Sequence, residues 1–219
     1  MPGESDKWFV TSVVLVSTLL AVVALLLVYG FYQRGDPLPW MDTFSSAASG
    51  WKTETDASAE VGYHDGAMRI LVNAADLSAW TWANRRFSSF RLIVDATQVS
   101  GPDDNEYGVQ VRMQDNEQFY RFSISGDGYY QVIKRYPGGW ELLSQEWVKS
   151  DAINLGAATN RIEVVCQGQW MTFIVNGVEL IQVEDEDYYV GDIGLYAGSF
   201  ADAGTGVEVQ FDNLRVESP

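Results

Sequence analysis

Side chains suited to acid–base or nucleophilic chemistry are few and scattered in this sequence of 219 residues. The one histidine, His64, lies in a Tyr-His-Asp-Gly segment, which is typical of a surface turn and not of a general base. The one cysteine, Cys166, follows an alternating apolar pattern, and we interpret it as a small buried hydrophobic residue. A single cysteine forms no intramolecular disulfide and no zinc site with paired cysteines.

The nearest approach to a carboxylate cluster is the acidic run at residues 184–187. It follows an apolar strand pattern and precedes Tyr188 and Tyr189, so we interpret it as a solvated loop. Cation binding is the alternative interpretation of the run. No glycine-rich segment follows a strand and opens a helix, so nucleotide binding has no support.

Two tryptophans are the candidates for sugar recognition. Trp80 and Trp82 are two residues apart, so their rings share one face of a predicted strand. Sugar-binding grooves place exposed rings beside polar groups. We therefore predict that Trp80 and Trp82 contact carbohydrate, with packing in the core or at a sheet edge as the alternative.

The elements that must position these side chains are strands. From residue 42 onward apolar residues alternate with polar ones, which is the period of a strand with one buried face. Turn signals separate the runs, and Asn176-Gly177 is a strong hairpin signal because both positions favour positive φ. The pattern predicts an all-β fold, an antiparallel sandwich of two sheets.

A different element precedes the strands. Residues 8–32 carry no charge and as a helix span about 37 Å, enough to cross a hydrocarbon core of about 30 Å. We expect a single transmembrane helix in the cell membrane, with the N-terminus cytoplasmic and the C-terminal domain extracytoplasmic. A cleaved signal peptide is disfavoured by the length of the run and by the absence of a basic leading segment and a cleavage site. A buried core helix is disfavoured by the same length without charge.

The predicted organisation is therefore a tail at residues 1–7, the transmembrane helix at 8–32, a proline-containing linker at 33–41 and a β-sandwich at 42–216. Small residues on one face of the helix would let a partner helix approach closely; these are Ser17, Ala21, Ala24 and Val28. The formal net charge is −16, and the first 34 residues contribute nothing to it. Such an acidic domain repels phosphate backbones, so we expect no nucleic-acid partner.

Three stretches carry a family resemblance: DTFSSAASGW at 42–51, NRIEVVCQGQWMTFIVNGVEL at 160–180 and GDIGLYAGSFADAGTGVEVQFDNLRV at 191–216. They resemble the opening, a central hairpin unit and the closing strands of concanavalin A-like and laminin-G-like jelly-roll domains. The resemblance implies a jelly-roll sandwich, and also a structural calcium ion at Asp42 and Asp212, where the first and last strands pair. That fold hosts lectins, glycosidases, adhesion modules and structural subunits.

The paired-carboxylate motif E-x-D-x-x-E of the family-16 glycoside hydrolases is absent. We therefore expect that the chain is not an enzyme and has no cofactor beyond the calcium ion. We expect a non-enzymatic accessory or interaction protein that contacts the lipid bilayer through residues 8–32 and has protein partners in a membrane complex. The alternatives are a carbohydrate-binding module that faces cell-surface glycans and, less favoured, a glycan-active hydrolase.

Overall fold

The computed structural model describes residues 4–32 and 35–219. The chain divides into two compact units, one up to Gly35 and one from Asp36 to Pro219, and each is described here by itself. The predicted tail at 1–7 and the predicted linker at 33–41 each include residues outside this description, namely 1–3 and 33–34.

The first unit is one helix, α1 (Glu4–Tyr32). Its segment Thr11–Gly30 has a mean hydropathy of 2.7, so by length and composition the helix is able to cross a membrane. A signal sequence would share these properties. Ser17 donates its hydroxyl to the Val14 carbonyl oxygen at 2.9 Å within the helix. The small-residue face is exposed, and its packing against another helix stays a prediction.

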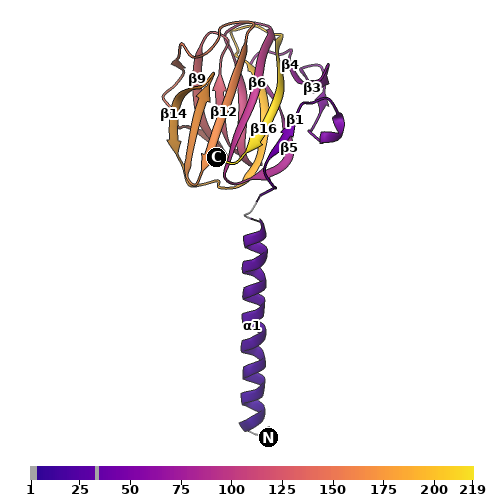
Figure 1. Ribbon diagram of the computed structural model, residues 1–219, viewed down its shortest axis with the longest axis vertical. Helices are drawn as coiled ribbons and strands as arrows, with labels where there is room; N and C mark the ends of the chain where they lie inside the picture. The colour runs from indigo at the N-terminus through magenta and orange to yellow at the C-terminus, as the bar shows by residue number, and fades with distance from the viewer. Residues whose placement is uncertain (1–3, 33–34) are drawn as a thin grey trace. The chain divides into compact units, whose positions relative to one another are not determined.

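The second unit is a sandwich of two antiparallel sheets, as predicted. Sheet A has the order β14-β13-β12-β6-β16-β4-β3-β2, with β1 beside β16. Its strands are β1 (Trp40–Asp42), β2 (Glu54–Thr55), β3 (Ala59–His64), β4 (Ala67–Val72), β6 (Phe90–Ser100), β12 (Thr159–Gln167), β13 (Trp170–Val175), β14 (Val178–Glu184) and β16 (Val207–Glu217). Figure 1 shows β12, β6 and β16 running side by side, and β14 lies beyond β13 at the end of the sheet.

Sheet B has the order β10-β9-β8-β7-β15-β5, with β11 beside β9. Its strands are β5 (Leu77–Phe87), β7 (Asn105–Asp115), β8 (Gln118–Ile124), β9 (Tyr129–Tyr136), β10 (Gly139–Leu142), β11 (Val148–Lys149) and β15 (Gly191–Ser199). A short 3-10 helix, Ala47–Ser49, follows β1.

The core fills the space between the two sheets. Phe122 of sheet B packs against Phe173 of sheet A with ring centroids 5.4 Å apart, and both side chains are fully buried. Burial of each such ring stabilises the fold by about 2–3 kcal/mol. One face of each strand is committed to this core, so the side chains on the opposite face of sheet B are left for other contacts. That opposite face is called the outer face of sheet B.

The chain enters the sandwich next to its own last strand. Trp40 of β1 pairs with Val216 of β16, and Asp42 pairs with Leu214. The Trp40 ring stacks on Trp51 and lies 6.0 Å from the ring of Phe87. These contacts fix β1 at the edge shared with the C-terminal strand.

Candidate functional site

The outer face of sheet B is assembled from five strands by their register. One row across the sheet contains Trp80, Tyr196, Gly108, Ser123 and Gln131. Paired residues of neighbouring strands project to the same side, so these side chains form one surface.

The next row contains Trp82, Gly194, Gln110, Arg121 and Ile133. Trp80 and Trp82 therefore share the outer face of β5, at one side of a surface that continues over β15, β7, β8 and β9. A further row adds Phe119, Arg135 and Trp140.

Two glycines occupy the middle of this surface. A Cβ atom on Gly194 would lie 2.8 Å from the Thr81 carbonyl oxygen and 2.9 Å from Met113 Sδ. A Cβ on Gly108 would lie 2.1 Å from the Phe122 carbonyl oxygen. Both positions therefore require glycine, because a side chain at either one would overlap its neighbours.

Three adjoining hollows open along this face. The Trp140 hollow, of about 320 Å³, is lined by Trp80, Phe119, Arg121, Gln131, Arg135 and Trp140 among others. The central hollow, of about 300 Å³, lies between Trp80 and Trp82 and is bordered by Lys52 and Ser58. The Asp192 hollow, of about 280 Å³, is lined by Trp82, Met113, Asp115 and Asp192. Asn116 borders all three, and their sizes are at the lower end for small-molecule sites.

Several buried polar atoms on this face have no hydrogen-bond partner among the described residues. They are Trp80 Nε1, Arg121 Nε and both amide atoms of Gln110, whose side chain is fully buried. A buried polar atom without a partner costs about 1–3 kcal/mol, so such atoms are rare unless a ligand or water binds them. Trp80 and Arg121 line the hollows, and Gln110 lies in register beside Arg121 without lining any of them. This arrangement makes the outer face of sheet B the candidate site.

The neighbouring groups hold Arg121 in place. Its guanidinium lies 4.5 Å from the centre of the Tyr196 ring, and Nη1 is 3.3 Å from Glu106 Oε1. Ser78 Oγ donates to the same Glu106 oxygen at 2.7 Å. Tyr196 donates its hydroxyl to Ser123 Oγ, and burial raises the pKa of Tyr196 well above its usual value. The phenol therefore stays protonated, and the arginine has a fixed direction.

The Asp192 hollow brings together two carboxylates. Asp192 Oδ1 accepts hydrogen bonds from the backbone N–H groups of Arg85 at 3.1 Å and Ile193 at 2.8 Å. Burial nevertheless raises the pKa of Asp192 to about 6. Asp115 accepts hydrogen bonds from the Glu117 N–H at 2.8 Å and from Gln118 Nε2 at 2.7 Å. A carboxyl group that titrates near neutral pH is suited to proton transfer.

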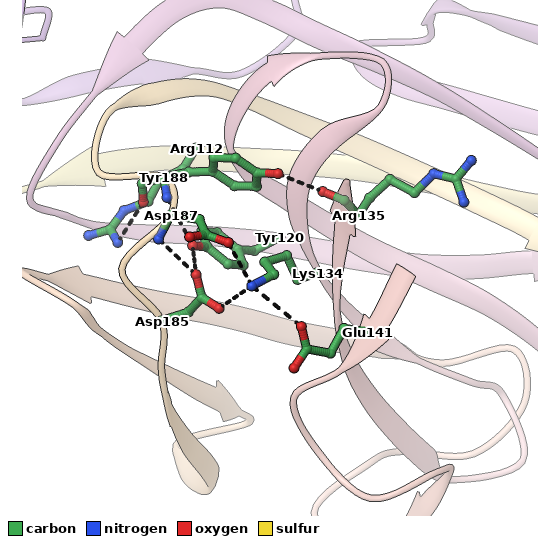
Figure 2. Close-up of polar contacts among 8 residues, drawn as sticks. All are labelled: Arg112, Tyr120, Lys134, Arg135, Glu141, Asp185, Asp187 and Tyr188. Atoms are coloured by element: carbon green, nitrogen blue, oxygen red, sulfur yellow. Dashed lines mark hydrogen bonds and ion pairs between the residues drawn. The ribbon is translucent and has the colours of Figure 1, made fainter. Parts of the chain in front are cut away.

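The acidic run at 184–187 has a different environment from the predicted solvated loop. Figure 2 shows Lys134 surrounded by carboxylates, with Nζ 2.6 Å from Asp185 Oδ2, 2.8 Å from Asp187 Oδ2 and 3.5 Å from Glu141 Oε2. The Asp185 side chain is only 11% exposed, and it also accepts the Tyr120 hydroxyl. Residues 185–187 do lie in a loop, as predicted, but Asp185 is not solvated, because it binds a lysine 51 residues earlier in the chain.

Electrostatics strengthen this cluster in spite of its burial. Burial lowers the pKa of Lys134, but hydrogen bonds to Asp185 and Asp187 outweigh it and raise the pKa above its usual value. Burial opposes ionisation of Asp185, but the Lys134 and Tyr120 hydrogen bonds lower its pKa below the usual value. The cluster therefore ties the β14–β15 connection to β8 and β9.

The remaining candidate residues lie elsewhere. Asp42 accepts hydrogen bonds from the Phe44 N–H at 2.8 Å and from Trp51 Nε1 at 2.9 Å, so protein donors already engage both of its oxygens. Asp212 accepts the Asn213 N–H at 2.6 Å, and no group of three or more potential metal ligands occurs among the described residues. The contacts of Asp42 fit a buried structural carboxylate better than a cation ligand, and calcium at Asp42 and Asp212 stays a prediction.

His64 and Cys166 lie apart from the outer face of sheet B. His64 ends β3 and is half exposed, and its Nε2 lies 3.3 Å from Asp65 Oδ2. Cys166 is fully buried in the core, and burial raises the pKa of its thiol to about 12. Neither residue is placed to act in the candidate site.

Comparison with known proteins identifies the family of the chain. The model of the 3-keto-alpha-glucoside-1,2-lyase-like domain matches residues 39–217. The chain belongs to this family. The match covers every strand of both sheets, so the outer face of sheet B is part of the lyase-like domain.

Solved structures with the same fold include proteins that bind and process sugars. The lyase-like domain is similar to the carbohydrate-binding module CBM66 from Bacillus subtilis, with 16% identity, a TM-score of 0.59, and coverage of 77% of this chain and 96% of that one. It is also similar to a putative glycosyl hydrolase from Parabacteroides distasonis, with 15% identity, a TM-score of 0.55, and coverage of 84% and 100%. A search of curated proteins found no match.

A third similar structure is the GH43 BlXynB protein from Bacillus licheniformis, with 13% identity and a TM-score of 0.59. The similarity covers 82% of this chain and 39% of that one. At these identities the likeness concerns the fold, which supports the predicted jelly roll at the level of a lectin-like sandwich.

The prediction that the chain is not an enzyme was wrong. The family of the lyase-like domain is described by a lyase activity, and glycosyl hydrolases share its fold. The prediction failed because it relied on a motif of paired carboxylates along one strand. Here the candidate polar groups come from different strands and become neighbours only through sheet register.

Sequence reasoning found Trp80 and Trp82 from their spacing but missed Gln110, Arg121, Asp192 and the two central glycines. Gln110 and Arg121 do stand at polar positions within the alternating patterns of β7 and β8. That signal places them on an outer face, but it does not say which strand lies beside them.

Proposed function

We propose that the lyase-like domain binds a sugar on the outer face of sheet B. The observation that carries this proposal is the pair of buried, unpartnered N–H groups of Trp80 and Arg121 in residues that line hollows walled by tryptophan. Sugar hydroxyls accept as well as donate hydrogen bonds, so they are suited to satisfy both N–H groups.

The rings would supply the apolar half of the site. Aromatic faces carry partial negative charge, and the C–H groups along one face of a sugar ring are weakly positive, so the two attract on stacking. Trp80 separates the Trp140 hollow from the central hollow, and Trp82 separates the central hollow from the Asp192 hollow. Three hollows in sequence favour a ligand of more than one sugar unit.

Binding is tested with the full-length protein in detergent micelles, by titration with malto-, cello- and xylo-oligosaccharides and observation of ligand signals by saturation-transfer NMR. The proposal expects saturation of ring C–H protons in at least one series, and competition between sugars that bind. If no oligosaccharide and no simple glycoside shows saturation, sugar binding on this face is rejected.

The raised pKa of Asp192 favours a second function, proton transfer on the bound sugar. A 1,2-elimination from a 3-keto-glucoside removes the proton at C2, which the adjacent C3 carbonyl makes acidic. The electron pair then forms the C1–C2 double bond as the C1–O bond breaks, and the leaving oxygen takes a proton. The products are an enone sugar and the alcohol.

Groups with the required roles line one end of the outer face. Asp115 would accept the C2 proton. Asp192 has a pKa of about 6, so at lower pH it carries a proton that it would give to the leaving oxygen. The assay is release of 4-nitrophenol from 4-nitrophenyl 3-keto-α-glucoside by the full-length protein, and no release above buffer at any pH would reject this activity.

The first unit would place the domain at a membrane. We propose that residues 8–32 form a single-pass anchor with the domain on the extracytoplasmic side. The support is the length and composition of α1 together with a fold that is shared with glycan-binding proteins. The face with Ser17, Ala21, Ala24 and Val28 is where a partner helix would pack. A fusion reporter at each terminus of the intact chain tests this topology.

A further inference from the structure

The Trp140 hollow differs in charge from the rest of this acidic domain. The chain has 30 acidic and 14 basic residues, yet the described residues that line this hollow include Arg121 and Arg135 and no Asp or Glu. The other two hollows both have carboxylates in their walls. The local charge therefore opposes the charge of the whole chain, which is the pattern of a site for an anionic group.

Arg135 supplies the charge that is not neutralised. It lies on β9, in register with Phe119 of β8 and Trp140 of β10. Its carbonyl oxygen accepts the Tyr188 hydroxyl at 3.1 Å, which fixes the backbone. In Figure 2 its guanidinium extends away from the Lys134 cluster, and the ion pairs among the described residues include none to Arg135.

Arg121 supplies a second donor on the same side. Its Nη1 forms an ion pair with Glu106 Oε1 at 3.3 Å, while its Nε is buried without a partner among the described residues. Stacking on Tyr196 keeps the guanidinium plane fixed. Arg121 and Arg135 are separated by two positions on the outer face, since Arg121 pairs with Ile133 and Arg135 pairs with Phe119.

The walls of the hollow indicate what kind of anion it would take. Trp80 stands on one side, and Trp140, which is 55% exposed, stands on the other. A free inorganic anion gains nothing from these rings, and the net charge of −16 repels it before it arrives. A sugar that carries a carboxylate gains from both features, because its ring packs on tryptophan and its planar anion matches a guanidinium.

We propose that the Trp140 hollow recognises a uronic acid, with the sugar carboxylate bound by Arg135 and assisted by the free N–H of Arg121. This proposal rests on the proposed sugar binding by the outer face of sheet B and specifies its ligand class. The central hollow, on the other side of Trp80, would then hold the next sugar unit of the same chain.

The test compares a charged sugar with its neutral form. Full-length protein in detergent micelles is titrated by calorimetry with tri-galacturonate and with its fully methyl-esterified form, and likewise with a glucuronic acid trisaccharide and its ester. We expect the acid to bind at least about tenfold more tightly than the ester in one series, as a charge-assisted hydrogen-bonded pair requires. This preference should weaken as salt is raised, because Arg135 is partly exposed.

Two variants distinguish binding in the Trp140 hollow from a general effect of the protein's net charge. Arg135→Gln should abolish the preference for the acid while ester binding stays the same, and Arg215→Gln, the same charge change on sheet A, should leave both unchanged. Equal binding of acid and ester, with Trp80-dependent binding retained, overturns the uronic acid proposal and leaves sugar binding in place. Failure of all charged and neutral sugars to bind overturns both. A sulfated trisaccharide that binds while the uronates do not also overturns the carboxylate assignment.

Discussion

Lys134 Nζ lies 2.6 Å from Asp185 Oδ2, and this contact joins strand β9 to the connection that leads from sheet A into β15. Both side chains are about nine-tenths buried, so neither charge is well solvated by water. Removal of one partner from such a pair leaves the other charge buried and uncompensated.

The first prediction follows from this pair. Lys134→Met should lower the free energy of unfolding by about 3 kcal/mol, because Asp185 would remain buried without its cation. Urea denaturation followed by tryptophan fluorescence measures the change. The control is Lys149→Met, on the exposed end of β11, which should change stability by less than about 0.5 kcal/mol. Equal stability of the Lys134 variant and the wild type would show that the cluster is not a structural tie.

The pair also predicts an acid dependence. The pKa of Asp185 is lower in the folded state than its usual value, so its stabilising contribution is complete above about pH 4. It declines as the pH falls further, through the lowered folded pKa, because protonation removes the charge that Lys134 binds. Stability curves of wild type and Asp185→Asn should therefore converge as the pH drops below about 4, and parallel curves down to pH 2 would contradict this reasoning.

Asp192 predicts the opposite dependence on pH. Its folded pKa of about 6 exceeds the unfolded value of about 3.9, so the wild type loses stability as pH rises from about 4 to 6. Asp192→Asn keeps a carbonyl oxygen for the N–H groups of Arg85 and Ile193 and carries no charge. At pH 7.5 the variant should be more stable than the wild type by about 2 kcal/mol, with no difference near pH 4.

The same variant separates stability from activity. If Asp192 gives a proton to the leaving oxygen, Asp192→Asn should release nitrophenol about 100-fold more slowly than the wild type. At pH 7.5 the same variant should nevertheless be more stable than the wild type. Full activity in the Asn variant would remove Asp192 from the proposed chemistry. The wild-type rate should fall as the pH rises above about 6, because the acid form is then lost.

The tryptophans of the outer face predict a selective loss of binding. Trp80→Ala should weaken oligosaccharide binding about tenfold, because Trp80 walls two hollows and carries an unpartnered N–H group. Trp82→Ala should have a smaller effect, since Lys52 already lies 4.5 Å from the centre of the Trp82 ring. Trp170→Ala is the matched control, because that ring is 43% exposed on sheet A. Isothermal titration in micelles is the measurement, and equal losses in all three variants would point to a general folding defect.

The apolar helix gives a further, independent prediction. The mature protein should keep residues 1–32, which intact-mass measurement on material from native membranes will show. It should also remain in the membrane pellet after an alkaline carbonate wash, which releases peripheral proteins. A mass that corresponds to loss of the first 30 or so residues would identify the segment as a signal peptide.

Much of the fold was predictable because its determinants are local. Alternation with a period of two places Ile162, Val164 and Cys166 on one strand face, and all three are fully buried in the core. The Asn176-Gly177 hairpin was expected from residue type, and both residues have positive φ, at 52° and 82°. Strand and turn preferences act within a few residues, so one sequence is enough to detect them.

The candidate site was only partly predictable because it depends on register between distant strands. Trp80 and Trp82 were found because they lie on one strand. Gln110 comes to lie between Gly194 and Arg121 through pairings that no local pattern specifies. The burial that raises the pKa of Asp192 likewise depends on packing, which composition does not reveal. The acidic run was misread for the same reason, since its lysine lies on another sheet.

The pairing of β1 with β16 has a mechanical consequence. A force applied to the N-terminal end of this unit would act first on Asp36, whose backbone N–H donates to the Arg86 carbonyl oxygen and whose carboxylate accepts the Arg86 N–H. It would then act on Trp40, which is held by an antiparallel three-residue ladder and by stacking on Trp51 and Phe87. Such a force would therefore be shared between β16 and β5, and β5 is the strand that carries Trp80 and Trp82.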